Sequence, residues 1–294
     1  MKRIKAEAVL RSTVSLAEGP MWLSSTGEVS WVEPFDGNLH IFNPESREDR
    51  VIDVGPYVGS AAPDISGGFV FATRQGFARL TSSGEIESLA GLVEQGVRLN
   101  DGKCAPDGAF WAGTIGENRE PLAGSLYRLS PTGSITIQLT GVTVSNGMAW
   151  EPDGKRFYYI DSPTRRIDSF DVDVTSQELS NRRTFVEVQE GWGNPDGMAI
   201  DDEGCLWVAL WGGGKVVRYT PEGVPDTVVE LPVKYVTSCC FGGSDGKDLY
   251  ITSAPAGFSP SGPRERLNGE ILFHCRSSAT GSPPVRYAYG RSSV

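Results

Sequence analysis

The sequence predicts an all-β fold: a six-bladed β-propeller whose blades are four-stranded antiparallel sheets. First, one pattern returns six times: a polar turn residue, a short strand, a glycine turn and an apolar strand. Second, six copies in 294 residues give about 49 residues each, near the roughly 40–50 residues of a four-stranded blade. Third, apolar residues alternate with period 2, and no long helical stripe is present. The 36 glycines and 19 prolines fit such a turn-rich chain.

The two inner strands of each copy flank a turn glycine. These glycines are Gly27, Gly68, Gly108, Gly154, Gly204 and Gly246. The apolar strands that follow them read Glu28–Val32, Phe69–Ala72, Ala109–Ala112, Arg156–Ile160, Leu206–Ala209 and Leu249–Thr252. Each is short and rich in aromatic and β-branched residues, as buried strands are.

Third and fourth strands follow in each copy. Third strands are predicted at Asn38–Phe42, Ser125–Leu129 and Lys215–Tyr219. Turn sequences such as Ser130-Pro131 and Thr220-Pro221 separate them from an outermost strand, which in the fifth copy begins near Pro225.

Both ends of the chain also resemble strands, at Ile4–Leu10 and Val285–Tyr289. In a closed ring we expect the N-terminal strand to complete the last blade, since this removes an open sheet edge. Blades cannot be separated without opening the ring, so residues 1–294 are expected to form a single propeller domain.

Composition excludes several classes of protein. The net charge of −10 disfavours nucleic acid and anionic membranes as partners. No apolar run approaches the ~18 residues of a membrane span, and no stretch of signal-peptide length follows the charged segment Met1–Glu7. The five cysteines form no C-x-x-C pair and are expected to be buried small hydrophobes in a reduced, cytoplasmic protein. Oligomeric state is left open.

One slot in the repeat carries oxygen-bearing side chains. It lies eight residues before each turn glycine, or nine in the first copy, and holds Glu18, Ser60, Asn100, Asn146, Asp196 and Ser238. Radial repeats bring equivalent positions together at one axis. Two carboxylates and two carboxamides make a hard-oxygen set with charge −2 that suits Ca²⁺, Mg²⁺ or Mn²⁺. Without a cation, Glu18 and Asp196 would repel, and one would tend to hold a proton. Alternatively, Asn-Gly and Asp-Gly are ordinary turn sequences, but four at one phase favour a metal site.

Three further residues are candidates for substrate contact. Arg98 lies two residues before Asn100 and would face the same way on an extended strand, where its guanidinium could hold a hydroxyl or carboxyl group. The alternative is a solvated arginine on the rim. Glu117 and Asn118 follow a strand end and could reach over the mouth, or belong to an ordinary loop. A Ser-His-Asp triad is disfavoured, because the two histidines, His40 and His274, lie in strand arms away from the slot.

The sequence resembles the senescence marker protein/gluconolactonase/luciferin-regenerating enzyme (regucalcin-like) family. The motifs that carry the resemblance run in order over nearly the whole chain. They are Leu16–Pro20, Arg98–Lys103, Trp111–Thr114, Ser145–Met148, Phe157–Ser162, Ile167–Asp171, Pro195–Met198 and Thr237–Gly243.

The resemblance implies a propeller with one divalent cation in its channel. It implies Glu18, Asn146 and Asp196 as metal ligands, Asp196 as the acid/base residue, and Arg98 and Asn100 as substrate contacts. A further substrate contact follows the Ala-Gly-Thr strand, where either Glu117 or Asn118 takes the role. Ca²⁺ is the expected metal, with Zn²⁺, Mn²⁺, Mg²⁺ and Fe²⁺ as alternatives.

From the slot and the resemblance together we expect metal-dependent hydrolysis of small-molecule sugar lactones to aldonic acids. Two other functions are compatible with the same residues. One is phosphotriester hydrolysis, as in the similar propeller of diisopropylfluorophosphatase. The other is a non-enzymatic calcium-binding or regulatory propeller.

Overall fold

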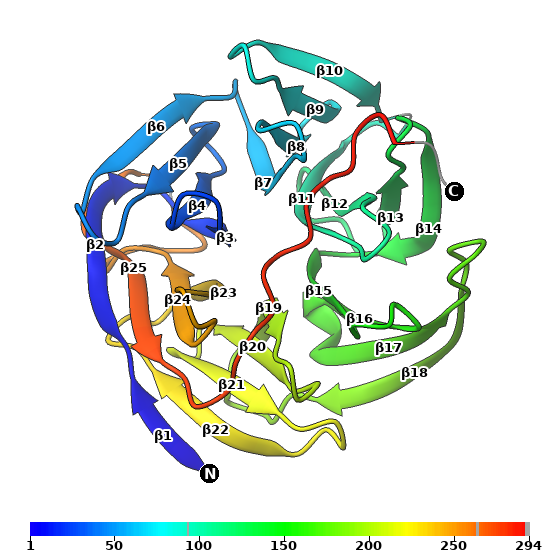
Figure 1. Cartoon of the computed structure of the whole chain (residues 1–294). Coiled ribbons are helices and arrows are strands. Elements are labelled where there is room, and N and C mark those ends of the chain that lie inside the picture. Colours follow the sequence, from blue (N-terminus) through cyan, green and yellow to red (C-terminus); the bar gives the residue numbers. More distant parts are fainter. Residues whose placement is uncertain (93, 263–264, 292–294) are drawn as a thin grey trace.

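A computed structural model describes residues 1–92, 94–262 and 265–291. The strands form six antiparallel blades around one central axis (Figure 1). The helix found in these residues is a single 3-10 turn, η1 (Ser162–Thr164). The predicted fold class, a six-bladed propeller with four-stranded blades, is confirmed.

The innermost strands surround the channel. They are β3 (Glu18–Leu23), β7 (Val58–Pro63), β11 (Val97–Cys104), β15 (Ser145–Trp150), β19 (Asn194–Ile200) and β23 (Val236–Gly242). Each contacts the next one along the chain, and β23 contacts β3, so that the ring is closed.

The other strands follow outward in each blade. The second strands are β4 (Glu28–Glu33), β8 (Phe69–Thr73), β12 (Phe110–Gly116), β16 (Arg156–Asp161), β20 (Leu206–Trp211) and β24 (Asp248–Ser253). The third strands are β5 (Asn38–Phe42), β9 (Gly76–Leu80), β13 (Gly124–Leu129), β17 (Arg166–Val172), β21 (Lys215–Tyr219) and β25 (Leu267–Arg276). The outermost strands are β6 (Asp49–Asp53), β10 (Ile86–Gly91), β14 (Ile135–Val142), β18 (Leu179–Glu187), β22 (Pro225–Glu230) and β2 (Glu7–Val14).

The N-terminal segment closes the ring, as predicted. β2 pairs antiparallel with β25 and supplies the outer strand of the last blade. The predicted strand Ile4–Leu10 is in fact two strands, because β1 (Lys2–Lys5) turns away to pair parallel with β22 of the fifth blade. The Ala6 N–H at the junction donates to the Glu230 carbonyl at 3.0 Å. The N-terminus therefore joins two blades.

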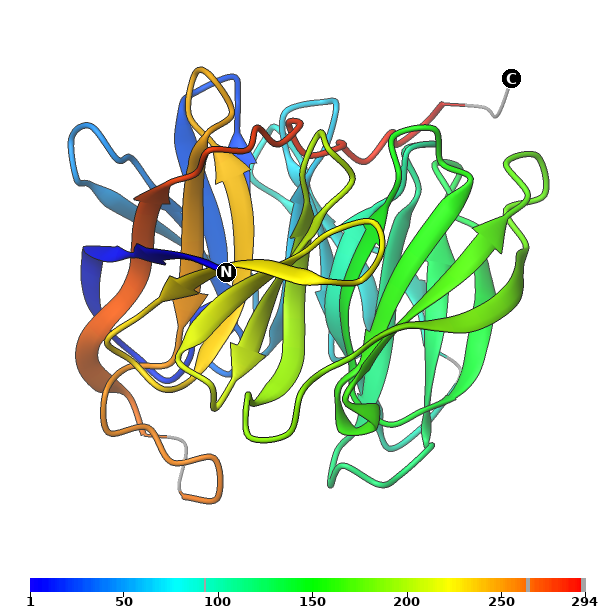
Figure 2. The same ribbon diagram turned by 90° about the horizontal axis from the view of Figure 1, so that it is seen from below.

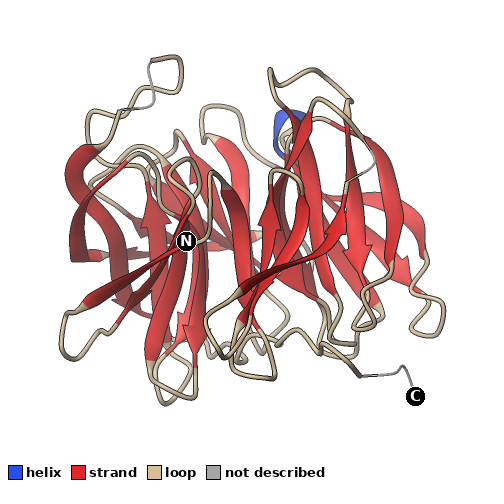
Figure 3. Cartoon of the chain, turned by 90° about the horizontal axis from the view of Figure 1, so that it is seen from above, coloured by secondary structure: helices blue, strands red, loops and turns tan. Residues whose placement is uncertain are grey.

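The strand predicted at Val285–Tyr289 is wrong. The C-terminal part of the chain crosses the channel axis (Figure 1) and forms no strand there. Tyr287 forms an isolated bridge with Asp64, and Pro283 and Pro284 have no N–H to donate. We call residues 277–291 the C-terminal strap and the face it crosses the rear face; η1 lies on the opposite, front face (Figures 2 and 3).

The strap is anchored at both ends of its crossing. Near blade 5, the Asp202 N–H donates to the Thr280 carbonyl at 2.8 Å. Beyond the axis, Tyr287 is fully buried and its hydroxyl donates to the Ser130 carbonyl at 2.9 Å. The strap therefore ties blade 6 to blades on the far side of the ring.

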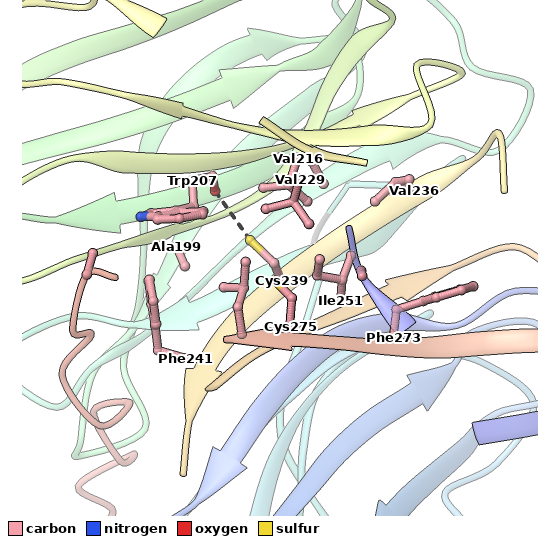
Figure 4. Close-up of a cluster of buried hydrophobic side chains, with 14 of the residues drawn as sticks. Ala199, Trp207, Val216, Val229, Val236, Cys239, Phe241, Ile251, Phe273 and Cys275 are labelled. Atoms are coloured by element: carbon pink, nitrogen blue, oxygen red, sulfur yellow. Dashed lines mark hydrogen bonds between the residues drawn. The ribbon is translucent and has the colours of Figure 1, made fainter. Parts of the chain in front are cut away.

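The apolar core lies between neighbouring blades. Between blades 5 and 6, Trp207 packs against Cys239 and Phe241, and the Cys239 thiol donates to the Trp207 carbonyl at 3.4 Å (Figure 4). All five cysteines are buried and free, which confirms the role expected for them. No helix in the described part of the chain is long and apolar enough to cross a membrane.

Deleting residues 2–14, and with them β2, should lower the unfolding temperature by about 10 °C or more and cause aggregation, because β25 then becomes an open edge. Deleting residues 2–5 is the control, since it removes only β1 and leaves the last blade complete; it should cost a few degrees. Calorimetry and light scattering measure both effects. Equal melting of the two deletions would contradict the closure role of β2.

Candidate active site

A β-bulge marks the slot in every innermost strand. In β11, Leu99 pairs with Thr114 and Gly102 pairs with Ala112, so that Asn100 and Asp101 together oppose one residue. Equivalent register shifts occur in the other five innermost strands. A bulge bends its strand and re-aims the side chains within it, and bulges are frequent beside active sites. The register shift contains the slot residue in β11, β15 and β19, and it lies directly beside the slot residue in β3, β7 and β23.

Glycines beside the slot let neighbouring strands approach closely. A Cβ added to Gly147 would lie 2.5 Å from the Asp196 carbonyl oxygen, and one added to Gly197 would lie 2.1 Å from the Ser238 hydroxyl. Contacts this short are forbidden to larger residues. These glycines therefore allow the slot residues of consecutive blades to converge on the channel.

Three carboxylates on innermost strands are close enough for their charges to interact: Glu18, Asp101 and Asp196. Burial raises the pKa of Glu18 well above its usual range, and the charges of Asp196 and Asp101 raise it further. Burial likewise raises the pKa of Asp196, with a further contribution from Asp101 and an opposing one from Arg119. Each carboxylate therefore experiences the charge of another one, in surroundings that disfavour any negative charge.

A chain of hydrogen bonds connects the predicted amides and guanidinium. The Arg98 guanidinium donates to Asn100 Oδ1 at 3.2 Å, and Asn100 Nδ2 donates to Asn146 Oδ1 at 3.2 Å. Asn146 Nδ2 then donates to the Ser162 hydroxyl at 2.8 Å, which donates to the Pro195 carbonyl at 2.6 Å. Because its Nδ2 is held by η1, the oxygen of Asn146 is directed away from η1. The chain ends beside Asp196.

Arg98 is buried, so it is not the solvated rim arginine considered as an alternative. The residue is 5% exposed, and its guanidinium donates to the Tyr57 hydroxyl and lies 4.6 Å from the Tyr57 ring centroid. Within the described residues its buried Nε has no hydrogen-bond partner. The structure thus fixes a cation beside Asn100 with one donor unused.

The loop after β12 places Glu117 and Asn118 at the rim. Glu117 forms an ion pair with Arg74 at 3.1 Å, and the exposed Asn118 donates to Glu120 at 2.8 Å. Arg119, on the same loop, acts on Asp196 through its charge. It opposes the rise in the pKa of Asp196.

Sequence reasoning missed Asp101 and Arg119. A signal for Asp101 was present: it follows a slot residue, where the first, fourth and fifth copies carry Gly19, Gly147 and Gly197. The second and sixth copies carry Ala61 and Cys239 there, so Asp101 is the one carboxylate in a position otherwise held by small residues. Arg119 belongs to a loop outside the repeat, so no pattern indicated its direction.

The donor chemistry of the predicted ligands fits a hard divalent cation. Glu18, Asn146 and Asp196 offer oxygen atoms as ligands, and the two carboxylates carry like charges whose repulsion a cation would relieve. In residues 1–92, 94–262 and 265–291, no three His, Cys, Asp or Glu side chains form a group that could hold a metal ion. The predicted set relies on an amide as its third ligand.

A separate cavity of about 400 Å³ occupies the rear half of the channel. Lys103, Trp150 and Phe241 line it, together with strap residues 282–285. It lies at the opposite end of the innermost strands from the slot. We call it the rear chamber and do not assign the active site to it.

Comparison with known proteins finds matches along the whole chain. Residues 16–255 match the model of the SMP-30/gluconolactonase/LRE-like region. Regucalcin of Xenopus laevis is 37% identical over 298 residues, covering 98% of this chain and 100% of its own. A Bacillus subtilis protein provisionally named sugar lactone lactonase YvrE is 36% identical, covering 93% of this chain and 95% of its own. The crystal structure of a calcium-binding protein, regucalcin, from Agrobacterium tumefaciens superposes with a TM-score of 0.88 at 25% identity, covering 98% and 99%.

The raised pKa values predict how the cation-free protein responds to pH. A carboxyl whose folded-state pKa is raised favours folding below its unfolded pKa, and this contribution is lost as pH rises through the folded pKa. Chelator-treated, metal-free protein should therefore lose folding stability as pH rises above about 4, near the ordinary pKa values of Asp196 and Glu18. Glu18→Gln should reduce this loss, whereas Glu178→Gln on an exposed turn should not. Melting temperatures at several pH values measure it; parallel curves for all three proteins would contradict the assignment.

Proposed function

The chain belongs to the SMP-30/gluconolactonase/LRE-like family, and from this premise we propose that it is a metal-dependent lactonase that opens sugar lactones to aldonic acids. The observation that carries the proposal is the meeting of Glu18 and Asp196 with the Arg98–Asn100–Asn146 chain at one end of the channel. An acid pair beside a fixed guanidinium supplies a base and a set of hydroxyl-binding donors. The provisional name of the Bacillus subtilis relative is consistent with this chemistry.

Glu18, Asn146 and Asp196 would hold the divalent cation. When bound, it would supply a Lewis acid that polarises the lactone carbonyl. The oxygen donors favour Ca²⁺, and the Agrobacterium tumefaciens structure is named as a calcium-binding protein. Zn²⁺, Mn²⁺, Mg²⁺ and Fe²⁺ are the alternatives that metal analysis would distinguish.

Asp196 acts as the acid/base residue in this proposal. Its carboxylate accepts a proton from the attacking water, whose oxygen bonds to the lactone carbonyl carbon. The bond from that carbon to the ring oxygen then breaks, and Asp196 returns the proton to the leaving oxygen. The charge of Arg119 helps keep Asp196 ionised, as a base must be.

Arg98 and Asn100 orient the hydroxyl-rich ring. The Arg98 guanidinium donates to Asn100 Oδ1, and packing against Tyr57 fixes the guanidinium before substrate arrives. Glu117 and Asn118, on the loop after β12, are proposed as rim contacts to the substrate. We place the enzyme in the cytoplasm, where its five free cysteines would stay reduced.

Purified protein should hydrolyse at least one lactone from a panel of glucono-, xylono-, arabinono- and galactonolactone. Chelator should abolish this activity, because the lactone carbonyl then lacks its Lewis acid. Added Ca²⁺ should restore the activity. A pH-stat assay follows the acid released. Turnover that chelator does not affect, or no turnover on the whole panel, would count against the proposal. Tight Ca²⁺ binding without hydrolysis would indicate a calcium-binding propeller instead.

Asp196→Asn should lower kcat by about 100-fold or more, since the amide keeps an oxygen for the cation but cannot accept the proton. KM should change much less. Steady-state kinetics on the best lactone gives both values, and calorimetric titration shows whether the variant still binds Ca²⁺. Glu178→Gln, on an exposed turn, is the matched control. Full turnover by Asp196→Asn with Ca²⁺ bound would remove Asp196 from the acid/base role.

A further inference from the structure

We propose that the rear chamber is a second ligand site of this protein, and that it binds a small apolar carboxylate. The carboxylate group binds the Lys103 ammonium, and the apolar part lies against Trp150 and Phe241, beside the C-terminal strap. The chamber measures about 400 Å³, which is within the usual range of small-ligand sites. Because it is at the opposite end of the innermost strands from the slot, the proposal does not rest on the lactonase reaction or on a metal.

Most of the chamber wall is apolar. It is built from the innermost strands of blades 1, 3, 4, 5 and 6 and from the strap. The apolar side chains include Met21, Ala149, Trp150, Ala199, Ile200 and Phe241. Such a wall favours the burial of an apolar ligand group. A hydroxyl-rich molecule such as a sugar lactone would instead lose hydrogen bonds to water without finding enough partners, so the chamber selects against it.

Lys103 supplies the positive charge of the chamber. It lies near the rear end of β11, and its Nζ donates to the Met198 carbonyl of β19 at 2.5 Å. An ammonium group has three N–H donors, so two of them are left for a ligand. No carboxylate among the described residues lies within ion-pair distance of Lys103. A carboxylate ligand would therefore give this charge the partner that the protein does not.

Two carboxylates, Glu151 and Asp201, also line the chamber. Each is already paired with an arginine. Asp201 Oδ2 accepts from Arg218 Nε at 2.8 Å, and Glu151 forms an ion pair with Arg156 at 3.3 Å. Of the charged residues that line the chamber, Lys103 alone thus lacks a partner of opposite charge in the described part of the chain. This difference favours an anionic ligand over a cationic one.

The C-terminal strap gives a ligand a way in. Main-chain hydrogen bonds hold it before and after the part that lines the chamber: the Gly281 N–H donates to the Gly246 carbonyl at 2.9 Å, and the Tyr287 N–H donates to the Pro63 carbonyl at 2.8 Å. Residues 282–286 between these anchors form no hydrogen bond with another main-chain group among the described residues. This stretch can therefore shift without breaking main-chain bonds. It also borders a second cavity of about 530 Å³, which leaves it room to move.

Calorimetric titration of indole-3-acetate and of octanoate into the purified protein tests the proposal. At least one of them should bind with one-to-one stoichiometry. The affinity should be the same with and without chelator, because the chamber lies apart from the proposed cation ligands. Indole-3-acetamide lacks the charge and gluconate lacks the apolar part, so each should bind about tenfold more weakly or less.

Variants of the chamber test where the ligand binds. Lys103→Met should weaken carboxylate binding about tenfold or more and remove most of the preference for indole-3-acetate over its amide. Lys103→Arg keeps the charge and should retain that preference, which a purely structural role of Lys103 would not explain. Ile200→Phe fills part of the chamber and should weaken binding of both compounds. Lys5→Met, which removes an exposed charge far from the chamber, is the matched control.

Four results would overturn the proposal. They are the absence of binding by both carboxylates at millimolar concentration, binding that Lys103→Met and Ile200→Phe leave unchanged, tighter binding of gluconate than of the apolar carboxylates, and binding that chelator abolishes. The last result would place the carboxylate on the cation at the front face. Each of them leaves the proposed lactonase function standing, because that function is tested by turnover.

Discussion

Closure of the ring is the constraint on which the rest of the structure depends. The pairing of β2 with β25 completes the last blade with a strand from the other end of the chain. Only in a closed ring does every innermost strand face the same axis, with β23 contacting β3 as closely as consecutive strands contact each other. The C-terminal strap adds a second tie across the rear face, through Tyr287. Residues separated by nearly the whole chain thus become neighbours in the channel.

Closure also has an electrostatic cost, which the candidate site uses. Glu18 and Asp196 are brought together in surroundings that raise the pKa of each. Such an arrangement is unfavourable in the empty protein and becomes favourable when a cation is present. Stability and function therefore oppose each other at the slot, and the apolar contacts between blades must offset the repulsion.

The side of the site that we propose to contact the substrate is rigid by comparison. Arg98 is held by the Tyr57 hydroxyl and ring, and Asn100 and Asn146 are fixed in one hydrogen-bond chain that ends at Pro195. The polar groups are therefore oriented before a ligand binds, which lowers the ordering cost of binding. Related proteins are expected to differ in selectivity in the loops outside this hydrogen-bond chain, such as the loop that carries Glu117 and Arg119.

The sequence alone determined the six-fold repeat and most strands within it. The third strands at Asn38–Phe42 and Lys215–Tyr219 match the structure residue for residue. It also singled out the slot, because strand alternation and turn glycines are local features that a linear pattern records. That was enough to predict that Glu18, Asn100, Asn146 and Asp196 should converge, and the family resemblance then implied Glu18, Asn146 and Asp196 as the metal ligands.

Tertiary structure alone decided what surrounds them. The reach of Lys103 to Met198 and the crossing of the strap depend on strands distant in sequence, so no local pattern encodes them. Val285–Tyr289 shows the limit clearly: its composition suits a strand, but the folded chain pairs it only through the isolated bridge between Tyr287 and Asp64. Charge follows the same rule, since whether Asp101 acts on Glu18 depends on the distance across the channel and not on the distance along the chain.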